Sequence, residues 1–514
     1  MSKTIIIIGA GLAGLSAALQ AAENGCNVKL VSSLPSERAQ SVMAEGGINA
    51  ALNTKDENDS PEEHFTDTIK AACGLADPNA VWGMTQAAPE LVHWLLKLGV
   101  KFNMSGYDDV DLRNFGGQKK KRTAFAQSDT GKQIMTAMID AVRRKEASGM
   151  VERFSHHSFL TLRLCGNICC GCVIRDEYSQ ETVELPGDAV IVATGGMHGL
   201  FGNTTGSLSN TGEVTAELFR LGVPLANGEM IQYHPTTVKC GGKCILISEA
   251  ARGEGGRLFA MKDGKQWYFM EEKYPELGNL MPRDITAREI WKVSHESEVF
   301  LDMTEISEEI ISNKLSGLAD DCMTYLHKDI RKEPVSVLPG IHYFMGGILV
   351  DEQHRTPIQN LYAAGECCAQ YHGANRLGGN SLLGALYGGR VAAKSACEQA
   401  DVVDLSCATQ IDFPPASQIS EIKQLNKVMQ ETMGVVRNEN TLLNGIQTVQ
   451  ALTGNLPLLG MAVLKSALAR KESRGAHWRE DYPKSNDDDY LKTTVARFDG
   501  KQIQISFVPV PERR

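Results

Sequence analysis

Histidine and arginine stand beside glycine in several segments of the middle and C-terminal third of the chain. The segments are Gln232–Thr236, Ser248–Gly256, Pro282–Asp284, His342–Gly347 and His372–Ser381. Because a guanidinium group binds a carboxylate through two parallel hydrogen bonds, two histidines and two arginines could hold both ends of a dicarboxylate. Each piece alone also has an ordinary explanation. A single histidine is more often a structural donor than a catalyst, and Glu249 with Arg252 could form an exposed ion pair worth less than about 1 kcal/mol.

The N-terminus has the pattern of a dinucleotide-binding turn. Thr4–Ile8 is typical of a buried parallel strand, Leu15–Glu23 of a helix and Asn27–Val31 of a second strand. Between the first strand and the helix, the GxGxxG glycines let a pyrophosphate approach the helix N-terminus. Ser32 and Ser33 stand where an acidic residue often holds the ribose, and a hydroxyl can still bond to it. The predicted cofactor-binding residues here are Gly9, Ala10, Gly11, Leu12, Ala13, Gly14, Ser32 and Ser33.

Two further segments run from a predicted strand into glycine. Asp188–Ala193 leads into Thr194–Gly196, and Leu361–Ala364 leads into Gly365 and Glu366. An extended FAD that touches several loops explains these segments better than a compact NAD site does. We therefore expect a flavin rather than a nicotinamide cofactor.

Length, charge and hydropathy exclude several classes of protein. At roughly 150 residues per domain, 514 residues predict about three domains. The net charge of −10 argues against nucleic acid or an anionic membrane as the main partner. The run Lys119–Arg122 is better explained as a solvated or substrate-steering loop. No apolar run is long enough to cross a membrane and no signal peptide is evident, so we expect a cytoplasmic protein.

The cysteines indicate a reducing compartment rather than a disulfide framework, because the 13 cysteines are odd in number and scattered. Cys165, Cys169, Cys170 and Cys172 are clustered, which suggests iron–sulfur ligation. However, residues 167–175 have the pattern of a strand, in which Cys169 and Cys170 point to opposite faces. We therefore predict no metal site.

The whole pattern resembles the flavoprotein subunit of succinate dehydrogenase and fumarate reductase, in a superfamily that includes L-aspartate oxidase. The similarity covers most of the chain and is firmest from residue 3 to about 400. It rests on the segments GAGLAGLSAA, MAEGGINAAL, FGGQKKKRTAFAQSDTG, VATGG, MIQYHPT, SEAARGEGG, PRDITAREI, HYFMGG, HGANRLGGNSLL and KESRGAHWREDYP.

The resemblance implies a role for each matching residue. Hydride passes between flavin N5 and one carbon of the substrate, and Arg283 transfers a proton at the neighbouring carbon. Glu249 and Arg252 form the relay behind Arg283, and His234 belongs to the same catalytic group. Substrate binding is implied for Ser248, His342, Arg376 and Gly47. The further cofactor-binding residues are Gln40, Ser41, Ala44, Glu45, Gly46, Gly195, Glu213, Glu366, Asn380, Ser381 and Leu382.

Two departures from the family bear on cofactor and substrate. Gln40 occupies the position of the histidine that links FAD covalently in membrane-complex members, so we predict non-covalent FAD and favour fumarate reduction over succinate oxidation. Asn114 and Gln118 flank Phe115–Gly117, where aspartate oxidases usually carry an acid for the substrate ammonium, and Met345 replaces their usual cysteine. Aspartate oxidase, a reductase of another enoate and a flavin-bearing assembly or redox-sensing module remain alternatives.

The chain has no CxxCH haem signature and no second nucleotide fingerprint. We therefore expect electrons to come from another protein, in this family an iron–sulfur subunit, through which the chain could sit peripherally on the inner face of a membrane. The predicted fold is α/β. A Rossmann-like FAD domain comprises residues 1–225 and 335–401, with an α+β capping domain inserted at 226–334. A helical domain follows at 402–490, with strands at 491–514. Within the helical domain, the two prolines of residues 412–417 predict a linker, and residues 419–437 and about 440–474 have helical periodicity.

Overall fold

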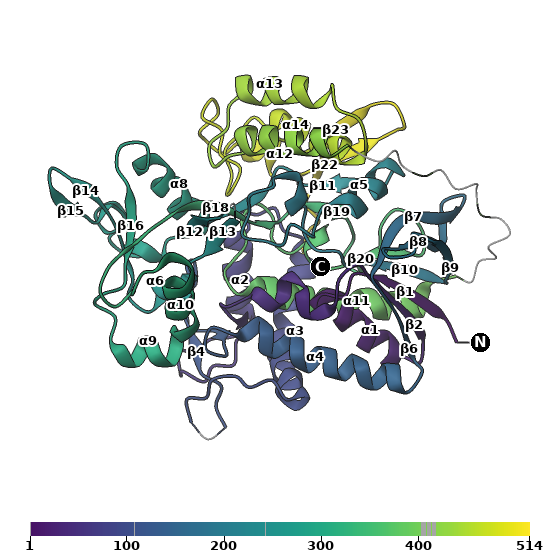
Figure 1. The fold of residues 1–514 in the computed structure, drawn as a ribbon, viewed down its shortest axis with the longest axis horizontal. Helices are drawn as coiled ribbons and strands as arrows, with labels where there is room; N and C mark the ends of the chain where they lie inside the picture. The colour runs from purple at the N-terminus through teal and green to yellow at the C-terminus, as the bar shows by residue number, and fades with distance from the viewer. Residues whose placement is uncertain (1, 107, 242, 402–407, 409–412, 414–417) are drawn as a thin grey trace.

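The computed structural model describes residues 2–514 except 107, 242, 402–407, 409–412 and 414–417. A parallel sheet in the order β20-β10-β1-β2-β6 forms its centre (Figure 1). The four isoleucines of β1 are buried, as expected for a strand covered on both faces. The strands are Leu361–Ala363, Ala189–Val192, Thr4–Ile8, Asn27–Ser32 and Val151–Ser155. The predicted α/β architecture is confirmed.

Helices cover one face of this sheet and a smaller sheet covers the other. α1 (Leu12–Glu23) packs on α11 (Asn380–Gln399), and a Cβ atom on Gly389 would lie 2.3 Å from the Ala13 carbonyl oxygen. Glycine is therefore required at position 389 for this close helix contact. The same layer contains α2 (Pro61–Ala71), α3 (Pro78–Leu98) and α4 (Thr130–Ala147). The opposite face meets β7 (His157–Cys165), β8 (Ile168–Asp176) and β9 (Thr182–Pro186), which share a core with Ile6 and Ile8.

A second unit, on the left of Figure 1, has a core of its own. One sheet has the order β13-β12-β18 and another β15-β14-β16-β17. Apart from Phe115, the buried residues of this core lie between Ile247 and Val337, as an inserted cap requires. The strands, in chain order from β12, are Ile231–Cys240, Lys243–Leu246, Arg257–Lys262, Lys265–Trp267, Val299–Asp302, Val335–Ser336 and Leu338–Phe344. The helices α6 to α10 are Glu249–Gly253, Phe269–Lys273, Arg283–Val293, Glu308–Lys314 and Ser316–Asp321.

The C-terminal region consists of three main helices and a hairpin. α12 (Ile419–Thr432) is shorter than the helix to Arg437 that periodicity predicts, and the predicted helix at 440–474 is two helices, α13 (Glu439–Val449) and α14 (Asn455–Ala469). The break contains Gly454, whose φ of +110° is incompatible with a continuous helix. The linker predicted at 412–417 lies outside the described residues, apart from Phe413.

The C-terminal hairpin of β22 (Lys492–Phe498) and β23 (Ile503–Pro509) completes a sheet that begins in the flavin region. Its order is β21-β19-β11-β22-β23. The remaining strands are Cys368–Ala369, Gly347–Leu349 and Leu225–Ala226, and a third small sheet contains Ile48–Asn49 (β3), Thr123–Ala124 (β5) and Leu112–Arg113 (β4). Within the described residues, no helix combines the length and apolar character needed to cross a bilayer.

A network of buried arginines fastens the C-terminal region to the rest. All five guanidinium N–H groups of Arg470 are used: they bond to Glu229, Glu472, the Thr494 hydroxyl and two backbone carbonyls, at 2.7 to 2.8 Å. Three more arginines extend the network. Arg474 pairs with Asp487, Arg479 pairs with Asp481, and Arg437 bonds to His477. The adjoining loop reaches the HGANR segment, because the Ala476 amide donates to the Ala374 carbonyl at 2.9 Å.

Candidate active site

The loops that precede α1 and α11 form the candidate cofactor cradle. A Cβ atom on Gly9 would lie 2.3 Å from the Ala193 carbonyl oxygen, and one on Gly14 would lie 1.8 Å from that of Gly9. No side chain caps α1 at Gly11, although the Leu12 amide donates to the Ser41 hydroxyl at 3.3 Å. The N-terminus of α1 therefore offers amide donors and the positive end of its dipole to an anionic group, which fits the pyrophosphate of FAD.

The other predicted cofactor residues converge on the same region. α11 begins without a side-chain cap, so Ser381 and Leu382 lie in an uncapped first turn. Asn380 is buried and bonds to Asn49, His64 and Thr68. Glu366 lies against Gly196, where a Cβ atom would be 2.7 Å from its carboxylate oxygen. These contacts bring three glycine-rich segments together.

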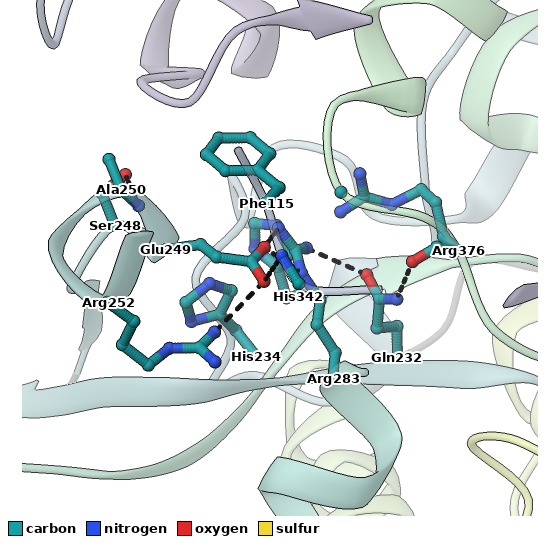
Figure 2. Close-up of polar contacts among 12 residues, drawn as sticks. Phe115, Gln232, His234, Ser248, Glu249, Ala250, Arg252, Arg283, His342 and Arg376 are labelled. Carbon is teal, nitrogen blue, oxygen red and sulfur yellow. Dashed lines mark hydrogen bonds and ion pairs between the residues drawn. The ribbon is translucent and has the colours of Figure 1, made fainter. Parts of the chain in front are cut away.

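The predicted catalytic residues of the cap lie around Glu249 (Figure 2). Arg283, the first residue of α8, donates to the Glu249 Oε2 atom from Nε at 2.8 Å and from Nη2 at 2.5 Å. Arg252 pairs with Oε1 of the same carboxylate at 3.3 Å. All three side chains are at most 7% exposed. The pair of Glu249 and Arg252 is therefore not the exposed local ion pair that spacing alone allows.

The opposite wall comes from β12, β18 and the HGANR loop. The rings of His234 and His342 lie 5.1 Å apart, centroid to centroid. Gln232 joins the two walls, since its side chain accepts from Arg283 at 3.1 Å and donates to the Arg376 carbonyl at 2.9 Å. The Arg376 guanidinium stacks over the Tyr343 ring at 4.4 Å.

Burial and charge set the protonation of these groups. Burial pushes the pKa of both His234 and His342 well below its usual range, and Arg283 lowers each further, so both imidazoles are neutral at pH 7. Burial alone would raise the pKa of Glu249, but Arg283 and Arg252 outweigh it, and this carboxyl is ionised. Burial and Arg283 lower the pKa of Arg376 to about 9.

The site lacks partners for several buried polar atoms. Among the described residues, none hydrogen-bonds to His234 Nε2 or to Arg376 Nε. Two guanidinium groups contact the Glu249 carboxylate, and Arg376 adds a third positive charge near Glu366 and Glu249, so the cluster is cationic. Buried polar atoms and charges are normally paired, so this arrangement is suited to an anionic ligand with more than one acceptor group.

Comparison with known proteins identifies the family. The profile described as FAD binding domain matches residues 4–382, and the one described as fumarate reductase flavoprotein C-term matches residues 452–513. The succinate dehydrogenase flavoprotein subunit of Bacillus subtilis is 38% identical, over 100% of this chain and 98% of its own. The chain belongs to the succinate dehydrogenase and fumarate reductase flavoprotein family.

Other members of this flavoprotein family match over similar lengths. The 8-methylmenaquinol:fumarate reductase flavoprotein subunit of Wolinella succinogenes is 32% identical, over 100% of this chain and 92% of its own. A solved structure of a mutant E. coli quinol fumarate reductase FrdA superposes with a TM-score of 0.90 at 28% identity, covering 99% of this chain and 97% of that one. The predicted family, oxidoreductase class and FAD-binding domain are thus confirmed.

The structure places the remaining predicted residues less directly. Gly47 has a φ of +137°, and its Cβ would lie 2.5 Å from the Ala124 carbonyl oxygen, so its glycine is required by the local backbone. Glu213 lies in the first turn of α5 (Glu213–Arg220), where its carboxyl interacts electrostatically with Arg175 and Glu177. Gly47, Glu213, Ala44, Gly46 and Ser33 are the least directly placed, and the catalytic, substrate-binding and cofactor-binding roles of all the predicted residues stay predictions.

The basic run and the cysteine cluster noted in the sequence each have a structural explanation. Arg122 is not in a solvated loop, because it is fully buried between Asp59 and Asp67, 2.8 and 2.9 Å away. Cys169 and Cys172 lie in the core of β8, and the Cys170 thiol contacts the Arg163 carbonyl. Within the described part of the chain, no group of His, Cys, Asp or Glu could hold a metal ion.

Sequence reasoning missed Gln232 and Gly116 as functional positions. The Gly116 amide donates to Glu249 at 3.1 Å, and a Cβ atom there would lie 2.5 Å from that carboxylate. Gln232 lies two residues before His234 and therefore shares its face of β12, a period-two signal that could have identified it.

Proposed function

We propose that the chain reduces fumarate to succinate as the catalytic flavoprotein subunit of an electron-transfer complex. The supporting observation is the cationic cluster of Arg252 and Arg283 on the Glu249 carboxylate with Arg376 close by, in which none of the described residues hydrogen-bonds to Arg376 Nε or His234 Nε2. The cluster has more positive than negative charges, and a linear dicarboxylate would bring one negative charge at each of its two ends. The buried neutral histidines add donors without adding charge.

Arg283 is the proposed proton donor. Reduced FAD, held by the loops before α1 and α11, would supply a hydride to one vinyl carbon of fumarate, and Arg283 would give a proton to the neighbouring carbon. The Arg283 guanidinium contacts the Glu249 carboxylate, which also contacts Arg252. After the transfer, Glu249 relays a proton from Arg252 back to Arg283.

Binding and water exclusion fall to the surrounding side chains. His342 and Arg376 hold one carboxylate of the substrate, and His234 and Ser248 hold the other. Each of His234, Ser248 and Arg376 is at most 5% exposed, so their hydrogen bonds act in a low-dielectric environment. The cations also offset the charge that develops on the substrate as hydride arrives.

Aspartate is a poorer substrate for this arrangement than fumarate. Its ammonium needs an anionic partner, but Glu249 is already engaged by two arginines and by the Gly116 amide. Phe115, beside that amide, contributes an apolar ring packed against the Gly46 and Gly378 positions. The ammonium group of aspartate would therefore be repelled by the arginines of the site.

The FAD is proposed to be non-covalently bound. Gln40 begins the short 3₁₀ segment Gln40–Met43, next to the Ser41 hydroxyl that contacts the start of α1. An amide at this position cannot form the histidyl link. Acid precipitation should release all the yellow colour into the supernatant, and colour retained in the pellet would contradict the proposal.

Electrons are proposed to come from an iron–sulfur protein subunit, since the described residues contain no metal-binding group of their own. The catalytic proposal is tested with the purified, FAD-loaded chain and reduced viologen as donor. Fumarate should reoxidise the viologen, whereas aspartate with oxygen should give no iminoaspartate. Aspartate turnover exceeding fumarate turnover would overturn the assignment.

A further inference from the structure

His198 is a fully buried histidine to which no function has been assigned. It begins the 3₁₀ segment His198–Leu200, just after the Thr194–Gly196 turn of the flavin region. Its Nδ1 atom lies 3.0 Å from the Thr204 hydroxyl. Its Nε2 atom lies 3.6 Å from a Glu366 carboxylate oxygen and has no hydrogen-bond partner among the described residues. The ring packs edge-on against Phe344.

The two sides of the His198 ring contact two different parts of the site. Glu366 follows the flavin-side strand β20, and its carboxylate accepts from the Phe344 amide at 3.0 Å. Thr204 precedes Thr205, whose hydroxyl lies 2.8 Å from His342 Nδ1 and whose amide donates to the Ile341 carbonyl at 2.9 Å. His198 therefore contacts Thr204, the chain neighbour of Thr205. Thr205 in turn contacts His342, which is proposed to bind the substrate.

The loop of residues 204–206 lies directly on the His198 ring. A Cβ atom on Gly206 would be 2.2 to 2.4 Å from three ring atoms, so the loop fits only because residue 206 is glycine. The Thr204 hydroxyl donates to the Gly206 carbonyl at 3.3 Å. It also accepts from the Gly206 amide at 3.1 Å, and its contact with His198 Nδ1 fixes where the loop sits.

Thr205 in turn determines which nitrogen of His342 carries the proton. His342 is neutral, because burial and nearby cations lower its pKa, so it has one N–H. If the Thr205 hydroxyl donates to Nδ1, the proton must be on Nε2, the nitrogen left to donate to a carboxylate. A displaced Thr205 would leave this tautomer unspecified.

We propose that His198 is a positioning residue that, through Thr204 and Thr205, holds His342 in the tautomer that binds a substrate carboxylate. This proposal rests on the proposed function, which assigns His342 to substrate. His198 acts through its Nδ1 side, and its Nε2 side faces Glu366 without being needed for the effect.

Three variants separate the two sides of the ring. His198→Phe keeps the packing against Phe344 and removes both nitrogens. His198→Asn restores a donor near the Nδ1 position, and His198→Gln restores one near Nε2. We expect the phenylalanine and glutamine variants to raise KM for fumarate about tenfold with a smaller change in kcat, because binding rather than chemistry is affected. The asparagine variant should stay within about threefold of the parent protein.

A readout without turnover separates this proposal from the proposed function. The Kd of malonate, measured by the perturbation of flavin absorbance, should rise in the same order, whatever reaction the protein catalyses. Thr205→Val should weaken binding similarly, and its effect should not add to that of His198→Phe, because both break one chain of contacts. Additive effects, an unchanged malonate Kd in His198→Phe, or a shifted flavin midpoint potential at unchanged Kd would overturn the proposal.

Discussion

Two clusters of buried arginines in this molecule differ in how their charges are balanced. In the C-terminal network, Arg437, Arg470, Arg474 and Arg479 lie with Glu229, Glu472, Asp481 and Asp487. In the candidate site, Arg252 and Arg283 share the Glu249 carboxylate, and Arg376 makes no ion pair among the described residues, although Glu366 and Glu249 act on it at longer range. The first cluster is neutral, whereas the second keeps one positive charge even when Glu366 is counted.

The contrast separates structural arginines from binding arginines. Taking a guanidinium out of water costs several kcal/mol unless partners in the protein compensate it. Arg470 donates a hydrogen bond from every N–H, but none of the described residues hydrogen-bonds to Arg376 Nε. A charge that the fold leaves uncompensated is stabilised only when a ligand supplies the missing anion.

The largest expected effect concerns Arg283. Arg283→Gln should lower kcat for fumarate about 10²- to 10⁴-fold, since general acid catalysis contributes that much. FAD content should be unchanged because Arg283 lies in the cap. Steady-state assay with a viologen donor checks this. Arg288→Gln, on the same helix but stacked on Trp478, is the matched control and should keep activity. Undiminished turnover in Arg283→Gln would refute the mechanism.

Arg470 tests the structural cluster. Arg470→Met leaves Glu229 and Glu472 buried with fewer partners, so the free energy of unfolding should fall by about 3 to 5 kcal/mol. Chemical denaturation measures the change. The control is Arg331→Met, which removes an exposed pair with Glu308 and should cost less than about 1 kcal/mol. Equal losses in the two variants would erase the distinction between compensated and surface charge.

Replacing Arg376, unlike replacing Arg470, should not lower the free energy of unfolding. Arg376→Met removes an uncompensated buried cation, so the unliganded protein should be no less stable than the parent protein. KM for fumarate should rise about 10- to 100-fold, because a hydrogen bond to a charged group is worth about 1.5 to 3 kcal/mol. Thermal unfolding and kinetics together decide. A large drop in Tm would place Arg376 among the structural arginines.

Glu45 should produce the smallest effect per step, because its contribution is spread over several pH units. Burial, with a contribution from Asp321, raises the pKa of its carboxyl to about 8, so the folded protein holds a proton that the unfolded chain releases above about pH 4.5. Stability should therefore fall as pH rises from about 5 to 8, by at most about 1.4 kcal/mol per pH unit. Denaturation at several pH values tests this, and Glu45→Gln should flatten the profile. A slope that persists in Glu45→Gln would assign it elsewhere.

Sequence patterns predicted the structural features that depend on residue periodicity or on glycine. The turn at Gly9 and Gly14, the strand β1 and the start of α8 at Arg283 are local, because sterics and periodicity within a few residues determine them. The side chains grouped at the site follow from the family resemblance, and the structure brings Glu249, Arg252 and Arg283 together.

The remaining features depend on contacts between distant segments. Arg122 is buried because Asp59 and Asp67, far away in sequence, surround it. α12 ends at Thr432 rather than Arg437, and the buried Arg437 guanidinium instead bonds to the Glu229 carbonyl and to His477. Gln232 joins the cap arginine to the HGANR loop across more than 140 residues. No local pattern encodes such pairings.

The contact between Ala476 and Ala374 has a consequence for biosynthesis. Gly475 also approaches Ala374 so closely that a Cβ atom would lie 2.5 Å from its carbonyl oxygen. The HGANR loop is therefore supported by a segment that follows α14 (Asn455–Ala469) in the chain. A nascent chain can form the first strands and helix early, but the contacts that support this loop form only after residue 476 has left the ribosome. The candidate site is thus assembled later in synthesis than the central sheet beside it.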